Sequence, residues 1–176
     1  TRGPEPLYLT ELLPMRWRCS TAKAVAMRNG ELDEWDIARG GLRSISSREI
    51  KSFWDGYIAR RRPVPIEHGS LYSRWRQVSD DLVISLYLTN RSVGLFVRGP
   101  RGERYRTTLQ RLLAEEPQLG ESLGASLDGY PGCCYLTNHP LAMTDPASWP
   151  EAFTWLQRQE EFYYRTLSEY FGKARR

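Results

Sequence analysis

The stretch that decides the fold is residues 80–99, DDLVISLYLTNRSVGLFVRG. Two runs rich in β-branched and aromatic side chains are separated by the polar pair at 90–91. Such side chains favour strands, and short polar connections favour antiparallel pairing. Together with the upstream run SLYSRWRQV at 70–78, the pattern predicts a three-stranded meander over residues 70–98.

Helical patterns surround this meander. Ser46 followed by Glu49 is the signature of a capping box, and Ser148 followed by Glu151 repeats it. Apolar residues at helical spacing predict helices over residues 47–62, 104–115 and 149–171. We therefore expect an α+β fold with an antiparallel sheet of about four strands, packed by these helices mainly on one face. The GCCYLTN run predicts its last strand near residues 132–137.

The composition is that of a globular chain. Hydrophobic residues make up 40% of the 176 residues, which excludes a disordered chain. No apolar run approaches the ~18 residues of a membrane helix, so we expect no membrane partner. The N-terminus lacks the apolar run of a signal peptide, and the three cysteines form no disulfide framework, so we expect a cytoplasmic protein. We expect an arm with a short helix at 1–45 and an α+β domain at 46–176.

Arginine dominates the basic residues. The net charge is +4, and among the 25 basic residues only Lys23, Lys51 and Lys173 are lysine. The guanidinium fork suits phosphate recognition, although the codon bias of a GC-rich genome also produces arginine.

The basic residues suggest a nucleic-acid contact. On the first predicted strand, Tyr72, Arg74 and Arg76 share one side, where an exposed row could stack a base and hold phosphates. The candidate nucleic-acid-binding residues are Arg60, Arg61, Arg62, Tyr72, Arg74, Arg76, Arg101 and Arg104. Two alternatives stay open: arginine stems that only cover aromatic rings, and cations favoured by the dipole at a helix C-terminus.

A second hypothesis is a protein-interaction or homodimerisation domain. The last predicted helix carries aromatic residues partly off its main apolar stripe. These candidate interface residues are Trp155, Phe162, Tyr164 and Phe171. The alternative is that a wide apolar stripe lies across the chain's own sheet.

A third hypothesis is a metal-dependent nuclease-like enzyme, although the sequence contains no recognisable motif for one. The acidic-x-Lys pattern at 49–51 falls in the first turn of a helix, where capping explains Glu49. Cys133, Cys134 and His139 have the residue types of thiol catalysis, but adjacent strand residues point to opposite faces. We assign no catalytic residue and expect no metal and no cofactor.

Three segments also carry a family resemblance: FWDGYIARR at 53–61, the stretch at 80–99, and SWPEAFTWLQRQEEFYYRTLSEYF at 148–171. Residues 47–173 resemble a bacterial domain family of unknown function that forms the C-terminal part of proteins with a predicted nuclease half. The resemblance implies an accessory domain in nucleic-acid-related or defence proteins, and it transfers no active-site residue. The function we expect is therefore a non-catalytic accessory module that binds nucleic acid through an arginine-rich surface.

Overall fold

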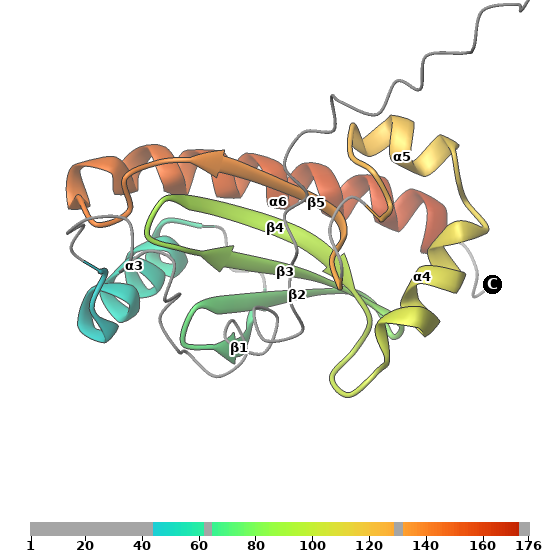
Figure 1. Cartoon of the computed structure of the whole chain (residues 1–176), viewed down its shortest axis with the longest axis horizontal. Helices are drawn as coiled ribbons and strands as arrows, with labels where there is room; N and C mark the ends of the chain where they lie inside the picture. Colours follow the sequence, from blue (N-terminus) through green and yellow to red (C-terminus); the bar gives the residue numbers. More distant parts are fainter. Residues whose placement is uncertain (1–43, 62–64, 129–131, 173–176) are drawn as a thin grey trace, which may run out of the picture.

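One antiparallel sheet organises the chain (Figure 1). The structure is a computed structural model that describes residues 44–61, 65–128 and 132–172. The strands lie in the order β1-β2-β3-β4-β5, so each pairs with its neighbour in sequence. They are β1 Glu67–Ser70, β2 Ser73–Ser79, β3 Leu82–Leu88, β4 Ser92–Arg98 and β5 Cys134–Pro140. The predicted α+β class is confirmed.

The sheet has one strand more than expected. Residues 70–78 do not form a single strand, because the chain reverses at residues 71–72 between β1 and β2. The Ser70 hydroxyl accepts a hydrogen bond from the Tyr72 backbone N–H at 3.2 Å, which supports this turn. A local side-chain bond of this kind lets serine stabilise a turn instead of continuing a strand.

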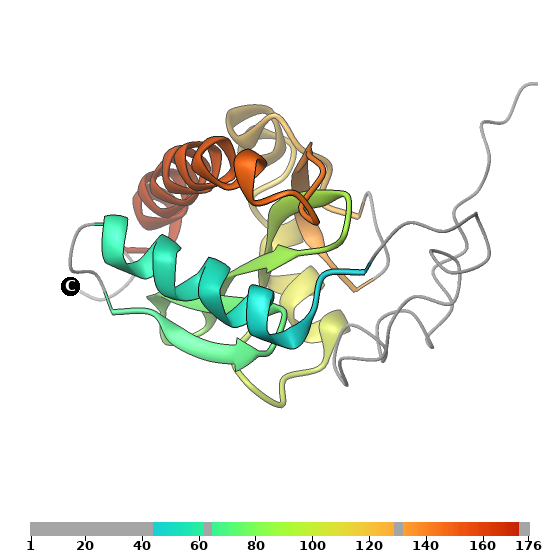
Figure 2. The ribbon, with the colours of Figure 1, turned by 90° about the vertical axis from the view of Figure 1, so that its left-hand side faces the viewer.

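Four α-helices pack around the sheet. They are α3 Ser47–Arg60, α4 Tyr105–Leu113, α5 Gln118–Leu123 and α6 Trp149–Phe171. The helix α6 runs along the sheet and contacts β2, β3 and β4, and α3 lies beside it (Figure 2). Helices α4 and α5 lie near one end of the sheet (Figure 1). We call the side of the sheet that carries α3 and α6 the first face, and the opposite side the second face.

The apolar core lies between the first face and the helices. On β3, alternate residues contribute to it, as the period of a strand requires. The buried members from β3 and β4 are Leu82, Ile84, Leu86, Leu88, Val93, Leu95 and Val97. Those from α3 and α6 include Ile50, Phe53, Trp54, Phe153, Leu156 and Leu167. Each such side chain contributes about 1.5–3 kcal/mol on full burial, which anchors α6 along the sheet.

The central strand β3 is buried on both faces. All seven of its residues are buried, including Val83, Ser85 and Tyr87, which alternate onto the second face. This explains why the run at 82–88 is almost wholly apolar in sequence rather than alternating.

One of the two predicted capping boxes is present. Glu49 N–H donates to the Ser46 hydroxyl at 3.3 Å, and Ser46 N–H donates to the Glu49 carboxylate at 2.9 Å. The box predicted at Ser148 is wrong, because Ser148 already has helical backbone angles and makes no side-chain cap. A 3₁₀ turn, η1 Pro146–Ser148, precedes α6, and Asp145 caps that turn by accepting from the Ala147 N–H at 2.9 Å.

Two parts of the prediction fall beyond these bounds. The arm expected at 1–45 with its short helix lies outside the described residues up to residue 43, and so does Arg62. Within the described part of the chain, no helix combines the length and the apolar character needed to cross a membrane.

The Ser46 cap gives a stability prediction. Ser46→Ala removes the acceptor for the Glu49 N–H, so we expect the free energy of unfolding to fall by about 1 kcal/mol. Urea denaturation followed by circular dichroism measures this. Ser52→Ala is the control, because Ser52 is exposed inside the same helix and caps nothing. An equal loss in both variants would contradict the capping role.

Candidate nucleic-acid interface

The predicted exposed row is in fact buried. Arg74 and Arg76 are each only 5% exposed. They pair in register with Leu86 and Ile84 of β3, and therefore lie on the first face beneath the helices. The expectation that this row is solvated is wrong, because the helices cover the face that carries it. Tyr72 is also partly buried against the apolar core.

A buried carboxylate explains how Arg76 is accommodated. Glu160 of α6 is 1% exposed and accepts from Arg76 Nη1 at 3.2 Å. The Tyr57 hydroxyl and the Arg61 guanidinium donate to the same carboxylate. Arg76 also contacts Glu161 at 3.1 Å. Burial, followed by the adjacent Glu160 carboxylate, raises the pKa of Tyr57, so its hydroxyl stays a donor.

Arg74 is held differently, because no carboxylate hydrogen-bonds to it. Its Nη1 donates to the backbone oxygens of Ser70 at 2.9 Å and Ser73 at 2.8 Å. Its guanidinium lies 5.0 Å from the centroid of the Trp54 ring, a favourable cation–π position. Burial lowers the pKa of Arg74. Arg74 is therefore a packing element of the α3–sheet interface.

The predicted arginine run at 60–62 divides in the same way. The Arg61 side chain is only 7% exposed and is bound to Glu160. Arg60 is exposed at the end of α3, where its guanidinium lies 4.9 Å from the Phe153 ring centroid. This run is thus partly a structural clamp, which the helix-dipole alternative did not anticipate.

A different group of arginines is accessible. We call residues 98–106, RGPRGERYR, the arginine loop. It joins β4 to α4 and includes the predicted residues Arg101 and Arg104, which are both exposed together with Arg106. The guanidinium groups of Arg98 and Arg101 lie 4.4 Å and 4.8 Å from the Trp75 ring centroid. Sequence reasoning had placed Trp75 on the opposite side from Arg74, as the structure does, but had given it no role.

Internal contacts fix the shape of the arginine loop. Arg111 of α4 binds the Glu103 carboxylate through two nitrogens, at 3.0 Å and 2.7 Å, and the Thr108 hydroxyl donates to it at 2.7 Å. A Cβ on Gly99 would overlap the Glu103 carboxylate, so glycine is required at that position. The hydrogen bond from Arg111 is the main cause that lowers the pKa of Glu103.

The charge of the loop is therefore uncompensated from within. Glu103 is the only acidic residue of 98–106, and Arg111 already neutralises it. The first turn of α4 contains no acidic residue, and its N-cap residue Arg104 makes no side-chain cap. The positive end of the helix dipole thus adds to the positive charge of the arginines.

The four aromatic residues predicted as a partner interface are mostly engaged within the chain. Trp155 stacks on His139 at 5.6 Å between centroids, and Tyr164 lies under Arg76 at 3.6 Å. Phe171 packs against the apolar core. Phe162 is the exposed one, at 42%.

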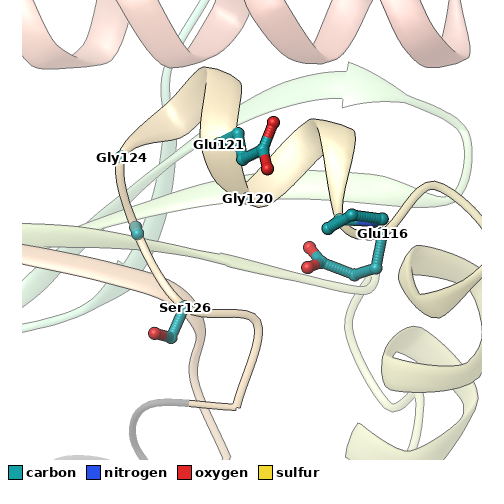
Figure 3. A pocket seen from close by; sticks show the side chains of 7 residues that line it. Glu116, Gly120, Glu121, Gly124 and Ser126 are labelled. Atoms are coloured by element: carbon teal, nitrogen blue, oxygen red, sulfur yellow. The ribbon is translucent and has the colours of Figure 1, made fainter.

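A shallow hollow of ≈ 360 Å³ lies over α5 (Figure 3). Its lining includes the carboxylates of Glu116 and Glu121 beside Gly120 and Gly124. Glu116 already accepts a hydrogen bond from the Tyr135 hydroxyl. The acidic character of this hollow is opposite to what a phosphate ligand needs.

The residues considered for catalysis have structural surroundings. Burial raises the pKa of Cys134 to about 12, which disfavours a reactive thiolate. His139 Nε2 lies 2.9 Å from the Glu151 carboxylate. Within the described ranges, no three His, Cys, Asp or Glu side chains come together as metal ligands.

The Glu160 cluster gives a second stability prediction. Glu160→Gln keeps the shape but leaves Arg61 and Arg76 without their shared buried counter-charge. We expect a loss of about 3 kcal/mol in the free energy of unfolding, measured by urea denaturation. Glu169→Gln, at an exposed position of the same helix, should change it by less than about 0.5 kcal/mol. A loss for Glu160→Gln no larger than for this control would refute the clamp.

No protein-family model, curated protein or solved structure matches the chain. The resemblance of residues 47–173 to a bacterial accessory-domain family stays a prediction.

Proposed function

We propose that the protein is a non-catalytic module that binds nucleic acid through the arginine loop. The observation that carries the proposal is the arrangement of residues 98–106. Arg101, Arg104 and Arg106 are exposed there, Trp75 packs against two guanidinium groups, and the single acidic side chain is bound to Arg111. A rigid set of guanidinium groups without a competing carboxylate matches the phosphates of a nucleic-acid backbone.

The arrangement favours contacts with phosphates over contacts with bases. The Trp75 ring is only 8% exposed, because Arg98 and Arg101 lie over it and β1 approaches it so closely that a Cβ on Gly69 would overlap the indole. It is therefore not open for a base to stack on. Binding through guanidinium groups and phosphates positions a ligand without reading its sequence. We expect binding that is strongly salt-dependent and nearly independent of sequence.

The proposal keeps part of the predicted site. Arg101 and Arg104 remain in it, whereas the burial of Arg61, Arg74 and Arg76 assigns those side chains to the interior. Arg60 is exposed on α3 and lies outside the arginine loop.

Charge removal tests the proposal. We expect the combined substitution Arg101→Ala, Arg104→Ala and Arg106→Ala to weaken binding of labelled oligonucleotides in fluorescence anisotropy. Losing three phosphate contacts should reduce the slope of log K against log salt by about 2 to 3, at about 0.7–0.9 per contact. Single- and double-stranded DNA and RNA are compared at about 50 and 200 mM salt.

The matched control removes three exposed positive charges elsewhere: Arg48→Ala, Lys51→Ala and Arg158→Ala. Equal losses in the two triple variants would reduce the effect to net charge, and no binding at the lower salt would refute the proposal. Gel analysis of the same oligonucleotides with Mg²⁺ tests the nuclease alternative, and we expect them to stay intact.

A protein-binding role of α6 is the second candidate, and the exposure of Phe162 favours it. Ile58 of α3 is also 37% exposed. If this surface joins two copies, Phe162→Ser should shift the mass in analytical ultracentrifugation from dimer to monomer without lowering stability. Leu113→Ser is the control, because Leu113 is 60% exposed on α4. A wild-type protein that stays monomeric at all concentrations would argue against a homodimer.

A further inference from the structure

The second face of the sheet is buried without a helix among the described residues to bury it. Val83 is 3% exposed, Ser85 2% and Tyr87 7%. These three residues belong to the central strand and alternate with the core residues of the first face. On β4, Phe96 lies 6.1 Å from the Tyr87 ring and adds to the same apolar surface.

The described helices account for the first face only. Helix α6 contacts β2, β3 and β4 from that side. The buried residues of α3, α4 and α5 belong to the same apolar cluster as the first-face residues of β3 and β4. Arg98 and Arg101 cover Trp75, but they do not explain the burial of Val83 and Tyr87.

We propose that residues 1–43 of the same chain are the occupant of this second face. The burial occurs within a single chain, so it does not require a second copy. The described part of the chain starts at Ser44, next to Ile45, which is 3% exposed and donates its N–H to the Asn90 side chain at 3.0 Å. Asn90 lies in the turn between β3 and β4, so the chain enters at the end of the two central strands.

The size of the surface fits such a segment. Five strands spaced about 4.8 Å apart, each about 3.3 Å per residue over seven residues, present an area of roughly 20 by 20 Å. Two helices or extended segments side by side, each about 10 Å across, cover that width. A segment of 43 residues is long enough to supply them.

The composition of the segment also fits. Within residues 7–17, LYLTELLPMRW, seven of eleven side chains are apolar. An apolar run of this density needs a partner surface, and the second face offers Val83, Tyr87 and Phe96. If so, residues 1–43 belong to the folded domain, and the boundary expected at 45–46 does not separate two units.

Thiol protection in the full chain tests this proposal, independently of any nucleic-acid binding. Ser85→Cys places a thiol of nearly the same size on the second face, and Ser52→Cys places one on the exposed side of α3. Both carry Cys19→Ser and a protease site inserted between residues 43 and 44, and the buried Cys133 and Cys134 are retained. We expect the thiol at position 85 to react with maleimide about 100-fold more slowly than the one at position 52.

Cleavage at the inserted site, followed by removal of the released segment, should abolish most of this protection. The thiol at position 52 should react equally before and after. Fast reaction at position 85 in the intact chain would overturn the proposal. So would full protection after the segment has been removed, and a dependence of that protection on protein concentration would then identify a second copy as the cover.

A second measurement covers the case in which the cleaved chain unfolds. Asn138 is exposed at the edge of the second face, opposite Gly94 in register. Asn138→p-benzoylphenylalanine in the intact chain should form photo-cross-links to peptides from residues 1–43. In an equal mixture of ¹⁴N- and ¹⁵N-labelled protein, these links should join peptides of the same label. Mixed-label links, or no link to 1–43, would overturn the proposal.

Discussion

The buried carboxylate of Glu160 is the constraint on which the arrangement of helices depends. It receives hydrogen bonds from Tyr57 of α3, Arg61 just beyond α3 and Arg76 of β2. Two buried guanidinium groups need this counter-charge, since an isolated buried cation is costly. The contact therefore fixes where α3 and α6 lie along the sheet. It also removes Arg61 and Arg76 from the surface, which leaves the arginine loop as the accessible basic element.

The fold was largely predictable because its signals are local. Alternating and continuous apolar runs predicted β3 and β4, and helical spacing predicted α6 with its observed bounds. The Ser46 cap followed from two residues three positions apart. The turn at 71–72 was missed, because SLYSRWRQV reads as one strand and the serine bonds that reverse the chain there carry no periodicity.

The site was less predictable, because burial of an arginine depends on a residue far away in sequence. Arg76 and Glu160 are separated by 84 positions, and neither carries a local signal of the other. One clue was available: Glu160 falls at helical spacing between Leu156 and Tyr163, on the apolar stripe of α6. A carboxylate on such a stripe indicates a buried basic partner. The pattern of Arg74 and Arg76 alone predicts their common side of the strand but not which face the helices cover.

The order of the strands has a consequence for how the chain folds. Every strand of the sheet pairs with its neighbour in sequence, so hairpins can form before distant segments meet. Contacts between neighbouring segments close short loops and form quickly, whereas docking of α6 onto β2 closes a loop of more than 70 residues. We expect the meander to form early and the polar cluster at Glu160 to form late. A late, directional contact of this kind favours one register of the helix after the apolar surfaces have met.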